Sequence, residues 1–115
     1  VDAGMTDLIR PALYQAWHGI EPVNPAAEDA RRDHWDIVGP VCESGDFLAH
    51  DRDLALAPGD LLAVGSAGAY GMVQSSNYNS RPRPAEVMVE NGHFRLIRRR
   101  ESSRELLALE KDLHG

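Results

Sequence analysis

The sequence predicts a mainly β protein, a Greek-key-like β barrel or sandwich with short helices and a C-terminal helix. Several short apolar segments are separated by turn residues, which is typical of folds built from many short strands. An Asn-Gly pair stands between two of these segments and is a strong hairpin signal. Only brief helical patterns are present, and no internal repeat is visible. At 115 residues the chain fits a single domain, residues 1–115.

The first third of the chain predicts a helical turn, a strand and a loop. Thr6 to Tyr14 has Pro11 in its middle, which allows a helical turn before the proline but no long helix through it. Gln15 to Val23 alternates loosely between apolar and polar residues and predicts a strand. Asn24 to Asp33 holds a proline and five charged residues, which indicates an exposed loop.

Two further strands are predicted in the middle of the chain. From His34 to Cys42 the apolar and β-branched residues favour a strand, with Gly39-Pro40 forcing an edge position or a bulge near its end. Ala57 to Asp60 places proline at the second and glycine at the third position of a type II turn. The apolar residues Leu61 to Val64 follow this turn and predict a buried strand.

The last third predicts a hairpin and a terminal helix. Glu86 to Glu90 and His93 to Ile97 flank the Asn-Gly pair, so we expect them to pair as antiparallel strands. Ser102 and Glu105 have the spacing of a capping box, which marks the start of a helix. The leucines that would line one face of this helix are Leu106, Leu109 and Leu113.

Composition and charge argue against two kinds of partner. The chain is 43% hydrophobic, and no apolar run approaches the roughly 20 residues that a membrane helix needs. The net charge of −6 argues against nucleic acid, because neutralising phosphates requires a basic face. The basic cluster Arg98 to Arg100 is followed at once by Glu101, which favours a solvated surface. We therefore expect no nucleic-acid partner and no membrane partner.

The N-terminus and the cysteine content indicate the compartment. Val1 to Gly4 lacks the basic start and apolar core of a signal peptide, and we expect the chain to begin inside a longer protein. Cys42 is the only cysteine, so no internal disulfide can form. Because a free thiol is most at home in a reducing environment, we expect a cytoplasmic protein.

The basic residues and histidines limit the chemistry open to this chain. Of its twelve basic residues, eleven are arginine and only Lys111 is lysine. A Schiff-base lysine for catalysis must therefore come from another segment. The five histidines show no close pairing, and one cysteine is too few for a structural zinc site, so we assign no metal.

Cys42 and Glu43 are the first candidate site residues. They follow a predicted strand end, where a cysteine is less readily buried, although a lone cysteine is more often an inert small hydrophobe. The carboxylates of Glu43 and Asp46 favour the neutral thiol, which suits an acid better than a nucleophile.

Three other segments are weaker candidates. Arg10 and Tyr14 are four residues apart and can meet on one side of a turn, although a surface arginine over an aromatic ring is the simpler interpretation. Tyr70 is the one large residue in Gly65 to Gly71, where small side chains would let the backbone approach a phosphate or merely form a tight turn. Ser75 to Pro84 is rich in turn formers and predicts a structured loop.

Taken together and in order, these motifs resemble the diaminopimelate decarboxylase family. The matching blocks are Val1 to Met5, Leu8 to Tyr14, Val38 to Asp46, Gly68 to Gly71, and Ser76 to Asn79 with Arg81 to Val87. Each block is short, but five in register make an accidental match improbable. The similarity ends near Val89.

The resemblance implies a pyridoxal phosphate enzyme of the alanine racemase and ornithine decarboxylase type. In such enzymes an N-terminal β/α barrel, absent from this chain, holds the cofactor through its lysine, and a C-terminal β domain completes the site across a homodimer. The implied reaction removes the carboxylate from the D-centre of meso-diaminopimelate and gives L-lysine and carbon dioxide, the last step of lysine biosynthesis. On this basis the chain alone is expected to be inactive.

The resemblance also implies roles for the candidate residues. Arg10 and Tyr14 would bind substrate, with Arg10 on the distal carboxylate, which suits the bidentate geometry of a guanidinium. Glu43 would take the distal ammonium. Cys42 and Glu43 would enter the active site from the partner subunit. Cys42 would protonate the carbon atom from which the carboxylate has been lost as carbon dioxide. Tyr70 would contact both the cofactor and the substrate.

Two alternatives stay open on the sequence. One is a related decarboxylase acting on ornithine, arginine or a carboxylated polyamine such as carboxynorspermidine. Cys42-Glu43-Ser44 with Arg10 favours a substrate with a second carboxylate, whereas the ornithine branch places an aspartate after its cysteine. The other is a binding or dimerisation module without chemistry. If a barrel with a cofactor lysine is encoded before Val1, the protein is an enzyme and not a binding or dimerisation module.

Overall fold

The computed structural model describes residues 1–111 and is mainly β with a few short helices, which confirms the predicted class. Within these residues the strands form three two-stranded antiparallel sheets. The pairs are β1 (Ile20–Pro22) with β4 (Leu62–Val64), β2 (Asp33–Val38) with β3 (Phe47–Leu54), and β5 (Glu86–Glu90) with β6 (His93–Arg98). The helical segments are α1 (Arg10–Tyr14), α2 (Gly71–Gln74), the 3-10 turn η1 (Tyr78–Ser80) and α3 (Ser103–Leu106).

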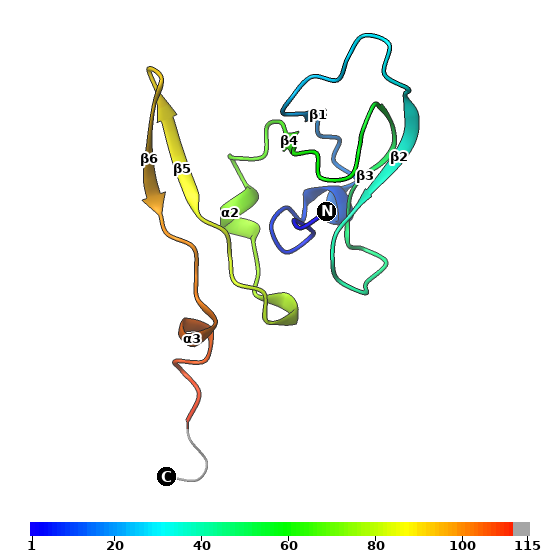
Figure 1. The fold of residues 1–115 in the computed structure, drawn as a ribbon. Helices are drawn as coiled ribbons and strands as arrows, with labels where there is room; N and C mark the ends of the chain where they lie inside the picture. The colour runs from blue at the N-terminus through cyan, green and yellow to red at the C-terminus, as the bar shows by residue number, and fades with distance from the viewer. Residues whose placement is uncertain (112–115) are drawn as a thin grey trace.

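The core lies where the β2–β3 ribbon meets β1 and the segment before α1 (Figure 1). Its buried members are Leu8, Ile20, Ile37, Leu48, Ala49 and Leu54. Three of these residues come from β3, a strand that the sequence analysis missed. The centre of β3 reads His50-Asp51-Arg52-Asp53, and this charged run hides the apolar residues at the two ends of the strand.

Thr6 to Tyr14 forms no long helix, as predicted. A turn closed by the Leu8 N–H and the Gly4 carbonyl at 3.0 Å precedes Pro11, but helix α1 itself contains Pro11 in its first turn, which the sequence did not predict. A missing N–H is harmless there, because the first N–H groups of a helix have no partner within the helix. The ring of Pro11 is fully buried, and Gln15 ends the helix in the left-handed conformation, with a φ of 53°.

The predicted strands around the core are confirmed in position but are shorter than expected. The strand expected within Gln15 to Val23 is the three-residue β1. β2 ends at Val38, before Gly39-Pro40, and its register shifts on both sides of Ile37, as expected of a bulged strand. The loop before β2 is exposed, as predicted.

The type II turn before β4 is confirmed. The Asp60 N–H donates to the Ala57 carbonyl at 3.1 Å, and Gly59 has the positive φ of 94° that the third position of this turn requires. The expectation that a buried strand follows is wrong. Leu61 is exposed, and β4 is only half-buried, because β1 is its sole partner strand among residues 1–111.

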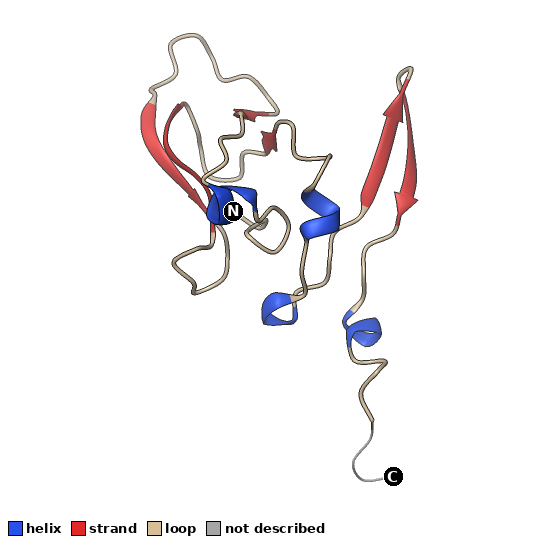
Figure 2. Cartoon of the chain, turned by 180° about the vertical axis from the view of Figure 1, so that it is seen from behind, coloured by secondary structure: helices blue, strands red, loops and turns tan. Residues whose placement is uncertain are grey.

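The hairpin β5–β6 is confirmed. Asn91 and Gly92 both have positive φ, 51° and 76°, as a type I′ turn requires. In Figures 1 and 2 the hairpin stands apart from the sheets that form the core.

The C-terminal helix begins as predicted but is only one turn long. The Ser102 side chain accepts from the Glu105 N–H, and the Glu105 side chain accepts from the Ser102 N–H. α3 then ends at Leu106, and Leu109 beyond it is exposed, so the predicted leucine face is not formed there. Leu113 lies outside the described residues. None of the helices in the described part of the chain has the length and apolarity needed to cross a bilayer.

Candidate active-site residues

A buried carboxylate shapes the loop that carries Cys42 and Glu43. The side chain of Asp46 accepts from the Met5 N–H at Oδ1 and from the Val41 N–H at Oδ2, both at 2.6 Å. Asp46 is only 4% exposed, so these amides replace the water that the carboxylate loses on burial. Asp46 thereby fastens the loop to the N-terminal segment of the chain.

Two glycines make room for this carboxylate. A Cβ atom on Gly4 or on Gly39 would lie 2.3 Å from an Asp46 carboxylate oxygen. The Gly39 N–H also donates to the Asp46 carbonyl at 2.8 Å. The glycines at both positions are therefore explained by the close approach of the backbone to Asp46.

Cys42 and Glu43 are presented to solvent by this loop. Both side chains are exposed, as expected for residues that follow a strand end. The sequence analysis treated Asp46 as a charge beside Cys42, but the contacts of Asp46 assign it to the framework of the loop. Glu43 is therefore the carboxylate of this loop that is available to a ligand.

Arg10, Tyr14 and Tyr70 form a second group. The Arg10 guanidinium lies 5.6 Å from the ring centroid of Tyr14 and 5.4 Å from that of Tyr70, within range of a cation–π contact. Arg10 and Tyr14 meet across one turn of α1, as their spacing predicted. Tyr70 comes from the residue just before α2. Sequence spacing gave no indication that Tyr70 would join them.

The Arg10 guanidinium has no carboxylate partner in the described part of the chain. Among residues 1–111, no Asp or Glu oxygen lies within salt-bridge distance of Arg10. Contacts with tyrosine rings engage the faces of the guanidinium and leave the N–H donors at its edge free. Tyr14 and Tyr70 are both 57% exposed. The group can therefore receive an anionic ligand, and a carboxylate matches the paired N–H donors.

Tyr78 belongs beside Glu43, and the sequence analysis missed it. Its hydroxyl donates to Glu43 Oε2 at 3.2 Å across 35 residues of sequence. This hydrogen bond and the negative charge of Glu43 raise the pKa of the Tyr78 phenol above its usual value. The structured loop predicted for Ser75 to Pro84 is present as η1 and its flanks, but no local pattern shows where that loop packs.

The candidate residues thus form two groups, one around Arg10 and one around Glu43. Within residues 1–111, no hydrogen bond, ion pair or cation–π contact joins the two groups. Each group is open to solvent on one side.

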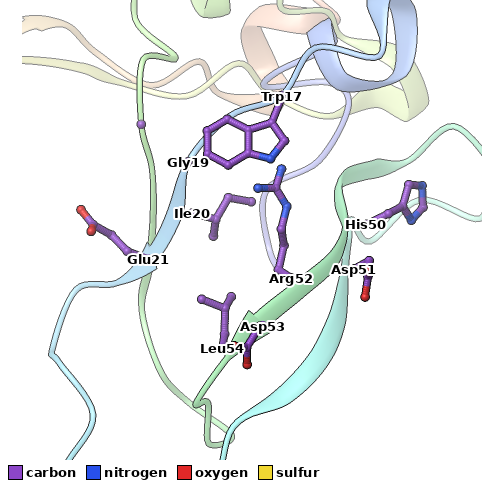
Figure 3. Close-up of a pocket in the computed structure, with 10 residues that line it drawn as sticks. Trp17, Gly19, Ile20, Glu21, His50, Asp51, Arg52, Asp53 and Leu54 are labelled. Atoms are coloured by element: carbon purple, nitrogen blue, oxygen red, sulfur yellow. The ribbon is translucent and has the colours of Figure 1, made fainter. Parts of the chain in front are cut away.

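A separate surface hollow contains none of the predicted site residues. It is lined by Trp17, Gly19, Ile20, Glu21, Gly65 and His50 to Leu54 (Figure 3). The Arg52 guanidinium lies 4.5 Å from the Trp17 ring centroid, which makes Arg52 a useful comparison for Arg10.

In the described part of the chain, no group of three His, Cys, Asp or Glu side chains could hold a metal ion.

The residues present fit one side of a cofactor site. The Tyr70 hydroxyl makes no hydrogen bond within residues 1–111, and its exposed ring lies over Arg10 in a segment of small side chains. The only lysine is Lys111, outside both groups. Neither group therefore contains a lysine that could anchor the cofactor that the resemblance implies.

Comparison with known proteins identifies the class. The family model for the pyridoxal-dependent decarboxylase C-terminal sheet domain matches residues 1–68, and the chain belongs to this family. The match includes Arg10, Tyr14, Cys42 and Glu43 and ends just before Tyr70.

The curated relatives are more specific. The chain is 63% identical to a diaminopimelate decarboxylase of Pseudomonas aeruginosa over 108 residues, which are 94% of this chain and 26% of that protein. It is 58% identical to one from Vibrio cholerae, over 98% of this chain and 27% of that protein. The chain thus spans about a quarter of the length of these relatives.

Solved structures of diaminopimelate decarboxylases are also similar to this chain. A crystal structure of a diaminopimelate decarboxylase matches all of this chain and 30% of its own, with a TM-score of 0.89 and 44% identity. The diaminopimelate decarboxylase of Helicobacter pylori, solved with L-lysine, matches 96% of this chain and 27% of its own, with a TM-score of 0.87 and 45% identity.

Proposed function

We propose that this chain is the C-terminal domain of a diaminopimelate decarboxylase, which converts meso-diaminopimelate to L-lysine and carbon dioxide. The observation that carries the proposal is Arg10, whose guanidinium lies within cation–π range of two tyrosine rings and lacks a carboxylate partner within residues 1–111. Two relatives above 55% identity with the name diaminopimelate decarboxylase support the same substrate. Both features call for a substrate with a second carboxylate.

Arg10 and Glu43 recognise the end of the substrate that does not react. Arg10 binds the distal carboxylate through paired N–H donors, and Tyr14 holds the guanidinium in place from one face. The Glu43 carboxylate binds the distal ammonium. Together they match both charges of an amino-acid head group, which lysine and ornithine do not fully offer.

Cys42 acts at the reacting end. When bound, pyridoxal phosphate would accept the electron pair freed by loss of carbon dioxide, with Tyr70 against it. Cys42 then donates its thiol proton to the carbon from which the carboxylate has left. Its exposed position on the loop suits a residue that reaches a site completed by another surface.

The complete enzyme contains partners that this chain lacks. We propose an N-terminal β/α barrel that supplies the cofactor lysine, and a homodimer in which Cys42 and Glu43 of one subunit face Arg10 of the other. Within residues 1–111 no hydrogen bond, ion pair or cation–π contact joins the two groups, which supports this arrangement. The exposed single cysteine suits a cytoplasmic enzyme.

The experiment is a product assay on the full-length enzyme. Purified enzyme is given meso-diaminopimelate, L-ornithine, L-arginine or carboxynorspermidine, and carbon dioxide and amine products are quantified. Only meso-diaminopimelate should turn over efficiently, with L-lysine as the product. Preferred turnover of any of the other three would contradict the proposal and favour the related decarboxylases.

A further inference from the structure

The hydrogen bond from Tyr78 to Glu43 is held by more than its own two side chains. Glu43 lies on the loop that Asp46 fastens to the Met5 N–H. Tyr78 lies on a loop whose Ser76 N–H donates to the Thr6 carbonyl at 3.0 Å. The backbone groups of two neighbouring residues, Met5 and Thr6, therefore anchor both loops and set their relative position.

Arg81 strengthens this anchor on the Tyr78 side. Its guanidinium donates to the Asp2 carbonyl at 2.7 Å and to the Thr6 hydroxyl at 3.2 Å. The Thr6 side of this contact is buried, with Thr6 only 2% exposed. These contacts tie the end of η1 to the same N-terminal segment that holds the loop with Glu43.

Glu101 also holds the loop that carries Tyr78. Its carboxylate accepts from Asn77 Nδ2 at 2.7 Å, and from the N–H and Nε of Arg83, both at 2.9 Å. These contacts lower the pKa of Glu101, the hydrogen bond from the Arg83 N–H first among them. Tyr78 is therefore placed by fixed residues on both sides of η1.

We propose that Tyr78 is a positioning residue that orients the Glu43 carboxylate toward the distal ammonium of the substrate. This inference rests on the function proposed above. Tyr78 occupies Glu43 Oε2, while Oε1 has only a long contact of 3.4 Å from the Ser44 hydroxyl. Oε1 is therefore the oxygen left for an ammonium group. A phenol with a raised pKa remains a hydrogen-bond donor at neutral pH.

The role predicts an effect on binding rather than on the chemical step. Glu43 would contact a part of the substrate that does not react, so it holds the ground state and the transition state about equally. Loss of such a contact raises KM and leaves kcat nearly unchanged. A packing role for Tyr78 would instead lower thermal stability or kcat together with cofactor content.

The test is a double-mutant cycle in the full-length enzyme with Tyr78→Phe and Glu43→Gln. Tyr78→Phe keeps the ring and removes only the hydroxyl. It should raise KM for meso-diaminopimelate by about tenfold, the usual scale for one hydrogen bond to a charged group, with kcat changed less than about twofold. In the Glu43→Gln background the same substitution should change KM by less than about twofold, because its charged acceptor is gone.

Two kinds of failure are distinguishable. If Glu43→Gln raises KM but Tyr78→Phe has no effect, or has the same effect in both backgrounds, the positioning role is overturned and the proposed function stands. If Glu43→Gln leaves KM unchanged, the proposed role of Glu43 in binding fails, and the role of Tyr78 fails with it.

Discussion

The body around β1 to β4 and the β5–β6 hairpin are stabilised in different ways. The body has a buried apolar cluster and a buried carboxylate, Asp46, that ties distant segments together. Among residues 1–111, the buried core contains no residue of the hairpin, whose strands pair with each other. Val87 opposes Leu96 and Val89 opposes Phe94 on one apolar face, and all four side chains are more than half exposed. The candidate site belongs to the body, where long-range contacts fix its loops.

This difference predicts where substitutions matter. In the body a single polar group can hold two segments, so its loss should affect the whole domain. In the hairpin each contact is exposed and local, so removing one side chain should lower the free energy of unfolding only slightly. An apolar face without a cover should instead govern association with other molecules.

The largest effect on stability is expected at Asp46. Asp46→Ala would leave the partly buried Met5 and Val41 amides without acceptors and should lower the free energy of unfolding by about 3 kcal/mol. Gly39→Ala should act in the same direction, because its Cβ would collide with the Asp46 carboxylate. Urea unfolding followed by circular dichroism measures both losses.

Glu86→Ala is the matched control in the hairpin. It removes a carboxylate that pairs with the Arg98 guanidinium at a partly exposed site, and it should cost less than about 1 kcal/mol. Equal losses from Asp46→Ala and Glu86→Ala would contradict the distinction between the two regions.

The second largest effect is expected at Cys42 and concerns activity. In the full-length enzyme Cys42→Ala should lower kcat by about 100-fold or more, the usual scale for losing a positioned general acid. KM and the visible absorbance of the bound cofactor should change little, because the Cys42 side chain is exposed. If kcat stays within a factor of two, the thiol is not the proton donor.

The same contrast explains which elements could be predicted from sequence. The hairpin was predicted to within one residue, because its turn needs only the local pair Asn91-Gly92. The capping box at Ser102 was predicted for the same reason. Strand β3 was missed because its centre is charged and only contacts with β2 and α1 explain its burial.

The candidate site was predicted in part for related reasons. Arg10 and Tyr14 are one helical turn apart, so their spacing is informative. The partnership of Tyr78 with Glu43 spans 35 residues and depends on how two loops are anchored. Likewise, nothing in the order of residues shows that Asp46 is directed at Met5 rather than at Cys42.

The apolar face of the hairpin should make the isolated chain self-associate. Val89→Ser with Phe94→Ser should shift the chain toward monomer in sedimentation velocity, with a stability loss below about 1 kcal/mol for one exposed cross-strand pair. Met88→Ser is the matched control, because Met88 opposes Arg95 on the other face. A monomeric wild-type chain that binds no hydrophobic dye would refute this prediction.

The smallest effect is expected at α3 in acid. Contacts with Arg99 and with the Ser102 cap lower the pKa of Glu105 from 4.5 to about 2. A depressed pKa means that the ionised form stabilises the fold. The contribution is complete above about pH 4.5 and is lost as the pH falls toward about 2. Amide chemical shifts of residues 102–107 should report this loss, and Glu105→Gln should abolish its pH dependence. A wild-type titration midpoint near 4.5 would contradict it.

The most direct test of the proposed function compares meso-diaminopimelate with D-lysine, which has the same reacting D-centre but no distal carboxylate. In the full-length enzyme Arg10→Ala should lower kcat/KM for meso-diaminopimelate severely. The ratio of kcat/KM for meso-diaminopimelate to kcat/KM for D-lysine should fall by about 100-fold. With D-lysine bound, the wild-type guanidinium is left without a carboxylate partner, and this penalty disappears in the variant. Arg52→Ala is the matched control, because it also removes a guanidinium that lies over an aromatic ring, but at a place outside the candidate site. It should leave the ratio of the two kcat/KM values unchanged. If Arg10→Ala lowers both values of kcat/KM in equal proportion, Arg10 does not read the distal carboxylate and the proposed substrate loses its main support.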